Sequence, residues 1–471
     1  MVAKPTYAST TVWSVKNAAK GAVLPLQSHA AAGAVCALHA GRQGESLSFS
    51  ERFAEIRTGF EPAFWVANVS ELFERLAYYG AFASLATYLH ESLGFSIERT
   101  GSLTGFFGGL VWFLAIVGGT AADRLGFRRA LSSAYLILTA AYFLIGSLGA
   151  EWMAPVRAAV PLGWLVLVVL MLPAFGIAMV KPCVVGTTAD ASRENVRSIG
   201  YSIYYTLVNI GGAVGPWIAS YAHEHLGVAN VFRVSALSVL LMFFAVQIFF
   251  REPKRSRERK APTIRETLRN FLAVLSNPRF LFFLIIFSGY WIAYWQEFIA
   301  LPLYIHSFIN PKADVERILV TDATCVIFLQ MLVSYLTQKI PAFRAVILGS
   351  LVSGAAWLII GFHASVVAAV LSIVVVAFGE MIQAPRYYEY ISRLAPAGQQ
   401  GTYMGFAFVP IGIGSLVGGP IGGALVHHYG EVLHQPEKVW WAITAIGTGT
   451  ALLLWIYDRI VKPGESAETP S

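Results

Sequence analysis

Long apolar segments alternate with short polar ones along most of this 471-residue chain. Each apolar segment has about 20 residues or more, which is the length a helix needs to cross the hydrocarbon core of a bilayer. The pattern predicts an all-α integral membrane protein with twelve transmembrane helices. We expect them at residues 63–89, 101–122, 130–149, 159–189, 199–221, 231–250, 279–305, 317–338, 343–362, 366–393, 401–426 and 438–460.

The longest polar interruption divides the twelve segments into two sets of six. Thr263 to Glu266 read T-x-x-E, a capping box, so an amphipathic helix is expected in that interruption, along the membrane surface. The first 59 residues read as a flexible extension, with a cleavable signal as the alternative. The predicted domains are an N-terminal extension (1–59), an N-terminal six-helix bundle (60–250), a cytoplasmic linker (251–278), a C-terminal six-helix bundle (279–461) and a C-terminal tail (462–471).

The basic residues between the segments indicate the orientation. The loops on the side of the termini and the C-terminal tail hold nineteen lysines and arginines, and the opposite side holds six. By the positive-inside rule, both termini are expected in the cytoplasm, and a bacterial inner membrane is the expected location. The same asymmetry accounts for the net charge of +7, so no nucleic-acid partner is expected.

Few residues suggest disulfide bonding, metal binding or catalysis. The three cysteines lie far apart with no C-x-x-C spacing, which supports neither a disulfide framework nor a zinc site. The sequence contains no phosphate loop and no nucleophile elbow, so an enzyme is not expected. We expect no cofactor.

Three charged residues interrupt the first apolar segment. One ionised side chain at the bilayer centre costs roughly 2.5–3.5 kcal/mol, so such residues need partners, water or a function. At helical spacing Glu71, Glu74, Arg75, Tyr78 and Phe82 share one stripe. The helix therefore directs a carboxylate pair, a guanidinium and a phenol the same way.

Residues 71 to 80 resemble the ExxER(F)xYYG motif of the proton-dependent oligopeptide transporters, a family of the major facilitator superfamily, with Leu76 in place of its Phe. Residues 119 to 129 similarly resemble the superfamily's GxxxDRxGxRR turn. The resemblance implies a major facilitator fold with two pseudo-symmetric six-helix halves, and a gating role for Asp123 and Arg124. Separately, glycines at four-residue spacing in the eleventh segment predict close helix packing.

Three further segments carry the resemblance. Residues 176–182 are similar to the family's GxGxxKPN, 204–211 to FYxxINxG, and Gly379 with Glu380 to the start of its tenth helix. The resemblance implies that Lys181 and Glu380 act in gating and substrate binding. A structural salt bridge for Lys181 and a simple helix–helix hydrogen bond for Asn209 remain alternatives. The implied proton-coupling residues are Glu71, Glu74, Arg75 and Glu297, and the implied substrate-binding residues are Tyr78, Tyr79, Lys181, Asn209, Glu380 and Arg386.

Two positions depart from the family. Phe82 stands where peptide transporters usually have an arginine that holds the peptide carboxylate and pairs with the carboxylate of the seventh helix. Arg386 is either a relocated cation or a partner of Glu389, one helical turn further on. Asp322 takes a place where the family often has asparagine, and is a weaker candidate for the site.

The resemblance implies a proton-coupled symporter that imports short peptides by alternating access. The alternatives are a proton-coupled carrier of another amphoteric or anionic solute, and a facilitator-fold receptor that does not transport. The expected partners are a small-molecule substrate, such as a di- or tripeptide, and membrane lipid, and the expected state is a monomer.

Overall fold

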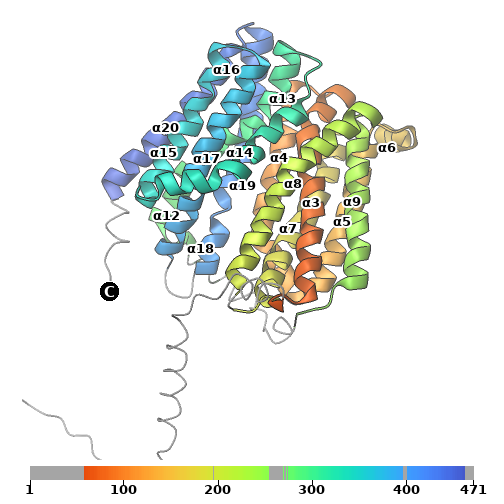
Figure 1. Cartoon of the computed structure of the whole chain (residues 1–471). Coiled ribbons are helices and arrows are strands. Elements are labelled where there is room, and N and C mark those ends of the chain that lie inside the picture. Colours follow the sequence, from red (N-terminus) through yellow and green to blue (C-terminus); the bar gives the residue numbers. More distant parts are fainter. Residues whose placement is uncertain are drawn as a thin grey trace, which may run out of the picture. The chain divides into compact units, whose positions relative to one another are not determined.

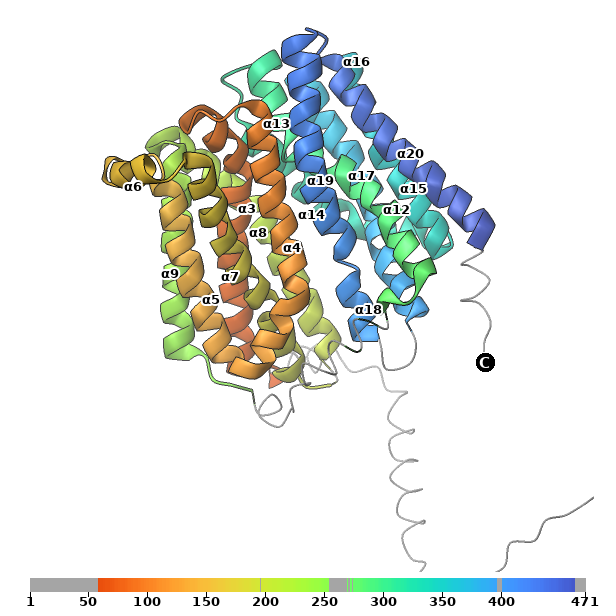
Figure 2. The ribbon, with the colours of Figure 1, turned by 180° about the vertical axis from the view of Figure 1, so that it is seen from behind.

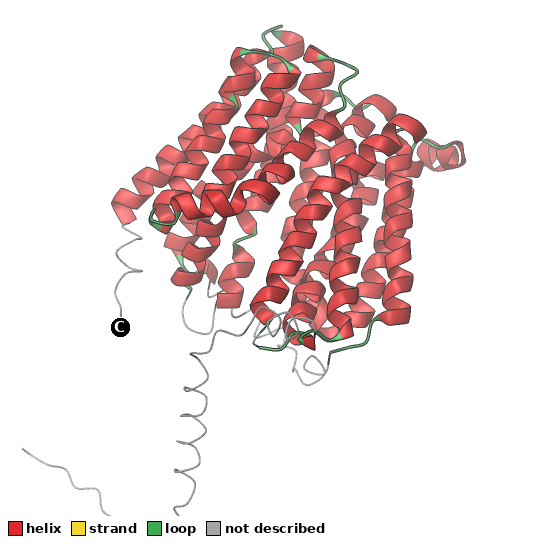
Figure 3. Cartoon of the chain, in the orientation of Figure 1, coloured by secondary structure: helices red, strands yellow, loops and turns green. Residues whose placement is uncertain are grey.

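The computed structural model describes residues 58–194, 196–253, 269, 272, 274–395 and 400–461, all of which belong to the compact unit Ile56–Ser471. Within these residues the regular structure is helical, and one isolated backbone bridge pairs Phe60 with Ser192 (Figure 3). The predicted amphipathic helix of the linker and both terminal segments lie almost entirely outside the described residues.

The first half of the chain forms six long helices, with short helical turns at their ends (Figure 1). A π-helical turn η1 (Tyr88–Ser92) continues α3, and η2 (Glu151–Met153) with α6 (Ala154–Ala159) connects α5 to α7. The long helices are α3 (Pro62–Thr87), α4 (Ile97–Leu125), α5 (Phe127–Ser147), α7 (Leu162–Asp190), α8 (Arg197–Leu226) and α9 (Val228–Phe249).

The second half forms six more spans, three of them interrupted. The seventh span consists of α12 (Pro278–Tyr294), the 3₁₀ turn η3 (Trp295–Glu297), α13 (Ala300–Tyr304) and η4 (Ile305–Ile309). The ninth is α15 (Ala342–Ala356) with α16 (Leu358–Phe362), and the eleventh is α18 (Gln400–Phe406), α19 (Val409–Leu425) and η5 (Val426–Val432). The eighth, tenth and twelfth spans are α14 (Val315–Thr337), α17 (Val366–Leu394) and α20 (Glu437–Val461).

Most of the twelve long helical segments in the described part of the chain could cross a membrane by length and composition. Nine of the helical segments there are long and apolar enough to cross a membrane. The other three are α3, α4 and α8; α3 carries Glu71, Glu74 and Arg75, charges that an apolar span rarely contains. The described helices agree with the predicted all-α fold of two six-helix halves.

Each half has its own hydrophobic core. Side chains such as Leu138, Leu170 and Val239 form the first core, and Phe283, Ile373 and Trp440 form part of the second. Large apolar side chains on the outer faces of the spans are exposed, as expected where lipid replaces water as the solvent. The apolar stripes thus assemble two bundles, which meet along a packed seam.

Glycines allow the seam between the bundles to pack backbone against backbone. A β-carbon added at Gly105 of α4 would come within 2.5 Å of the Gly419 Cα and the Ser415 carbonyl oxygen of α19. The Ser415 hydroxyl also donates to the Gly105 carbonyl at 3.1 Å. Helices α4 and α19 lie side by side in Figure 2. The close packing expected from the glycine spacing is confirmed at Gly419.

The turn between α4 and α5 uses a glycine that no other residue replaces easily. Gly126 has a φ of 78°, a left-handed conformation that side chains disfavour. Glu252 accepts from the Arg128 amide at 2.8 Å and thereby caps the first turn of α5. The side chains of Asp123 and Arg124 lie outside the described ones, so their gating role stays a prediction.

Candidate functional site

The charged residues of α3 form one buried network in the N-terminal bundle. The exposed fractions of Glu71, Glu74 and Arg75 are 1%, 0% and 5%. The Arg75 Nε donates to Glu74 Oε2 at 2.6 Å and lies 3.6 Å from Glu71 Oε1. The guanidinium carbon lies 4.9 Å from the centre of the Tyr78 ring. One cation therefore holds two carboxyls, as the stripe on the sequence predicts.

The two carboxyls are not held equally. Glu74 receives a short charge-assisted hydrogen bond from Arg75, whereas neither oxygen of Glu71 has a hydrogen-bond partner among the described residues. Burying an ionised carboxylate that has no hydrogen-bond donors costs free energy, and protonation lowers this cost because the acid is neutral. The two carboxyls therefore differ in their surroundings, since Glu74 holds the hydrogen bond from Arg75 and Glu71 holds none among the described residues.

Lys181 adds a second cation, from α7. It lies within electrostatic range of Glu71 and Glu74, and its ammonium lies 4.8 Å from the Trp112 ring and 5.1 Å from the Phe408 ring. Trp112 belongs to α4, and Phe408 lies just before α19 in the other half. No ion pair joins Lys181 to Glu380 in the described structure. The ammonium is instead bracketed by two aromatic faces, one from each bundle.

The C-terminal bundle carries three acids in the membrane interior. Glu297 lies within electrostatic range of Asp322 and Glu380, and Tyr294 donates to Asp322 Oδ2 at 3.3 Å. Glu297 is fully buried, and neither of its oxygens has a hydrogen-bond partner among the described residues. Among the described residues, no ion pair joins Glu297, Asp322 or Glu380 to a basic side chain, whereas Arg75 pairs with both Glu71 and Glu74.

A break in the seventh span positions Glu297. The indole of Trp295 donates to the Ile411 carbonyl at 3.0 Å, and the Gln296 amide donates to the Gly418 carbonyl at 3.0 Å. These two bonds hold the η3 turn against α19. The adjacent end of α12 also presents the negative end of a helix dipole, which favours cations.

Phe82 belongs to an aromatic cluster. Its ring centre lies 5.4 Å from that of Trp295, 5.7 Å from Phe298 and 5.8 Å from Phe107. The position where the resemblance leads one to expect a cation is thus filled by packed rings.

Helix α8 lines an open pocket with its first two turns and the residues that follow. The lining side chains are Arg197, Tyr201, Ser202, Tyr204, Tyr205 and Thr206. Tyr205 is 55% exposed, and the Asn209 amide donates to the Tyr205 carbonyl at 2.8 Å. Tyr79 lies within electrostatic range of both Tyr205 and Glu380. Tyr79 of α3 therefore lies near Tyr205 of α8 and the predicted residue Glu380 of α17.

Arg386 has structural partners in this conformation. It donates to Glu389 Oε2 at 2.7 Å and to the Gln338 carbonyl, at the end of α14, at 2.9 Å. Of the two alternatives that the sequence left open, this geometry favours pairing with Glu389. Its role in substrate binding stays a prediction.

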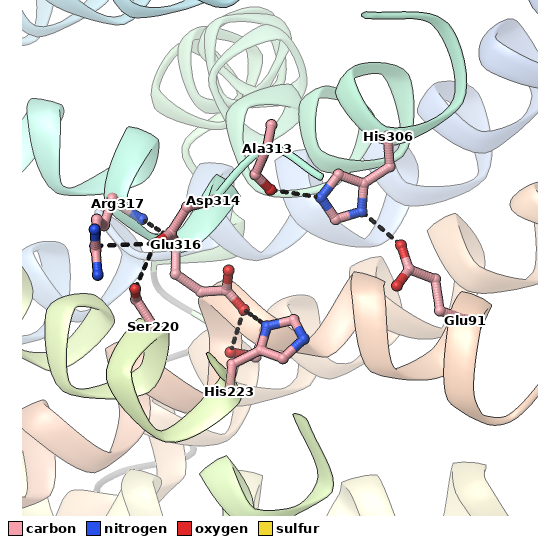
Figure 4. Close-up of polar contacts among 9 residues, drawn as sticks. Glu91, Ser220, His223, His306, Ala313, Asp314, Glu316 and Arg317 are labelled. Atoms are coloured by element: carbon pink, nitrogen blue, oxygen red, sulfur yellow. Dashed lines mark hydrogen bonds and ion pairs between the residues drawn. The ribbon is translucent and has the colours of Figure 1, made fainter. Parts of the chain in front are cut away.

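Sequence reasoning missed a second group of polar residues, at the ends of the spans farthest from the termini. We call this end the distal face. There, polar side chains of the two bundles contact each other directly (Figure 4). The contacts are Glu91–His306 at 2.5 Å, His223–Glu316 at 2.8 Å, Ser84–Glu316 at 3.0 Å, Ser220–Asp314 at 2.6 Å and Glu224–Arg317 at 3.5 Å. The clustering of histidines at the ends of predicted spans was the available signal.

Comparisons with known proteins agree with this architecture. The model of the Major Facilitator Superfamily matches residues 69–313 and 311–471. The chain belongs to the Major Facilitator Superfamily. Multidrug resistance protein MdtH of Cronobacter sakazakii is 24% identical over 382 residues, covering 81% of this chain and 90% of that protein. MdtH of Salmonella newport is 23% identical over 401 residues, covering 83% of this chain and 94% of that protein.

Solved structures of peptide transporters share the fold. A mutant of the peptide transporter POT in complex with alafosfalin superposes with a TM-score of 0.70 at 18% identity, covering 86% of this chain and 96% of that one. A POT family transporter in complex with a thioalcohol-conjugated peptide superposes with a TM-score of 0.71 at 15% identity, covering 84% of this chain and 96% of that one. The superfamily predicted from the motifs is therefore confirmed, and the likeness to the peptide transporters is a likeness of fold.

Proposed function

We propose that this protein is a proton-coupled secondary transporter that imports small amphoteric solutes by alternating access, with short peptides as the leading class. The observation that carries the proposal is the buried network of Glu71, Glu74 and Arg75. Two carboxyls share one guanidinium, and one of them lacks hydrogen-bond donors. Such a pair can take up and release a proton as its surroundings change.

The buried charges of the two bundles support an amphoteric substrate. Lys181 offers a cation for an anionic group, and its aromatic bracket leaves it without a carboxylate bonded to it. In the opposite bundle, Asp322 and Glu380 provide carboxyls for a protonated amine, with Tyr294 between them. A solute with a positive and a negative end matches this arrangement better than a neutral one, because each buried charge then gains a partner.

The conformation supports alternating access. The two bundles touch at the distal face, while the open pocket of α8 lies at the end where that helix begins. If the termini are cytoplasmic, as the basic residues indicate, this is an inward-facing state with its outer side closed. Rocking of the bundles would then expose the same site to the outside. We propose a monomer in a bacterial inner membrane.

A second candidate is proton-coupled export of drug-like molecules. The aromatic cluster around Phe82 favours it, since it replaces a carboxylate-binding cation with apolar surface. The relatives named multidrug resistance proteins are consistent with it.

Uptake into proteoliposomes tests the proposal. We expect a labelled dipeptide to accumulate against its gradient when the exterior is made acidic, and not when a protonophore is present. Glu74→Gln should abolish accumulation, while counterflow, which needs no net proton movement, survives at least in part. Glu61→Gln is the matched control, because Glu61 is exposed at the start of α3 and has no side-chain capping bond.

Two outcomes would contradict parts of this proposal. Full accumulation by Glu74→Gln would remove the acidic pair from the proton pathway. Gradient-driven movement of a lipophilic dye, with no uptake of any dipeptide, would favour the export candidate instead.

A further inference from the structure

The distal face holds titratable groups that the proposed coupling on α3 does not use. Two histidine–carboxylate pairs cross from one bundle to the other, and they run in opposite directions (Figure 4). In one, Glu91 belongs to the N-terminal bundle and His306 to the C-terminal bundle. In the other, His223 is N-terminal and Glu316 is C-terminal. These contacts exist only while the distal face is closed.

The contacts of His306 determine its protonation. Its Nδ1 lies 2.5 Å from Glu91 Oε1, and its Nε2 lies 3.0 Å from the Ala313 carbonyl oxygen. Both partners are acceptors, whereas a neutral imidazole has only one N–H to donate. Both hydrogen bonds can therefore form only when His306 is the doubly protonated imidazolium. The hydrogen bond from His306 lowers the pKa of Glu91, which keeps that partner ionised.

The contacts of Glu316 likewise favour the protonated form of His223. The carboxyl of Glu316 is 2% exposed and accepts from the Ser84 hydroxyl at 3.0 Å as well as contacting His223 Nδ1 at 2.8 Å. A buried carboxylate is stabilised most by a charged donor. Hydrogen bonding to Glu316 raises the pKa of His223, and the nearby Glu91 and Asp314 act in the same direction.

The other charged groups in these contacts do not neutralise the carboxylates that pair with His306 and His223. Arg317 pairs with Asp314 at 2.9 Å and with Glu224 at 3.5 Å, so it is already shared between two acids. His90 is near Glu91, but its Nδ1 contacts the Phe95 carbonyl in its own bundle. Among the groups in these contacts, the four acids Glu91, Glu224, Asp314 and Glu316 outnumber the one permanent cation, Arg317, and two protonated histidines reduce the excess to one negative charge.

We propose that His306 and His223 form a proton-binding site on the distal face, and that proton binding there favours the closed face. When the bundles separate, each histidine loses its carboxylate and binds its proton less tightly. By linkage, acid stabilises the closed state, and the stabilisation declines as the pH rises through the raised pKa of His223. Glu91 acts in the other direction, since protonation of its carboxyl at much lower pH would weaken the contact. The face is therefore most firmly closed in mildly acidic surroundings.

The histidine site of the distal face and the proposed proton-coupling site on α3 have different roles. Protons arriving from the distal side would close that side behind the substrate, whichever residue carries the proton onward. The inference rests on the alternating-access part of the proposed function and not on the identity of the substrate. It can be tested without transport.

Spin-label distance measurements on the full chain in nanodiscs provide the test. Labels at Trp152→Cys and Phe362→Cys, both exposed and near the distal ends of the two bundles, would report closure after the three native cysteines are replaced by alanine. From about pH 6 to about pH 8, we expect the closed-to-open ratio to fall several-fold, because the two histidines bind their protons more tightly in the closed state than in the open one.

The variants separate the proposed site from other titrations. His306→Gln should lower the closed-to-open ratio near pH 6 and remove most of its pH dependence, and adding His223→Asn should remove the rest. Glu91→Gln, which removes the partner from the other bundle, should act like His306→Gln. The control is His427→Gln, because His427 also contacts a carboxylate at 2.5 Å, but that of Glu431 on its own helical turn.

Folding is checked by the melting temperature of each variant. An unchanged pH profile in both folded His306→Gln and folded Glu91→Gln would overturn the proposal. So would a profile that His427→Gln flattens as much as His306→Gln does. Loss of peptide uptake in the wild-type protein, with the pH-dependent closure intact, would contradict only the substrate part of the proposed function.

Discussion

Gly105→Ala should shift the protein away from the conformation described above. The added methyl group would lie 2.5 Å from both the Gly419 Cα and the Ser415 carbonyl oxygen. Carbon atoms in favourable contact are about 3.5–4.0 Å apart, so α4 and α19 would have to separate by about 1 Å. Both obstacles are backbone atoms, which cannot rotate away as the end of a side chain can.

The size of the shift follows from the cost of overpacking. An extra carbon forced into a packed interface typically costs about 1–3 kcal/mol. That cost falls on the closed state alone if the seam separates when the distal face opens. Since 1.4 kcal/mol corresponds to a factor of ten, the closed-to-open ratio should decrease by about 5- to 150-fold. The hydrogen bond from Ser415 to the Gly105 carbonyl would weaken as well.

The labels at Trp152 and Phe362 can measure this shift at one fixed pH. The matched control is Gly405→Ala, because a β-carbon at Gly405 would meet no atom within 4 Å. We expect Gly105→Ala to populate the longer distance while its melting temperature stays near that of the control. An unchanged distance distribution in folded Gly105→Ala would refute the reasoning, since it would mean that the seam absorbs a methyl group without separating.

Two further predictions concern basic residues. Lys181→Ala should lose transport while folded protein remains in the membrane, because it removes the ammonium held between two rings; wild-type uptake by this variant would leave Lys181 only a packing role. Arg386→Ala should lower the free energy of unfolding by about 1–2 kcal/mol with little change in substrate affinity, because it deletes charge-assisted bonds to Glu389 and to a helix end. Arg393→Ala is its control, since Arg393 contacts the same Glu389 but is 54% exposed and should contribute less than about 0.5 kcal/mol. Melting curves and ligand titrations decide, and a tenfold loss of affinity in Arg386→Ala would restore the idea of a relocated cation.

The sequence alone determined the number and place of the membrane spans. Segments of about 20 apolar residues have no stable alternative to a helix in the bilayer, because every backbone donor and acceptor must be satisfied within the segment. The shared stripe of Glu71, Glu74 and Arg75 also follows from helical periodicity, since partners one turn apart meet whatever surrounds them. For the same local reason, the pairing of Arg386 with Glu389 was among the alternatives that the sequence offered.

The tertiary structure decided which residues meet across the two halves. Lys181 lies between Trp112 and Phe408, which are separated from each other by almost 300 positions, whereas the sequence resemblance had grouped it with Glu380 in gating and substrate binding. His306 meets Glu91 across a similarly long separation. Such contacts depend on how two rigid bundles are rotated against each other, and helical periodicity within one segment carries no information about that rotation. The two bundles can also adopt more than one such arrangement, so the cross-bundle partners belong to a conformation of the protein and not to its sequence alone.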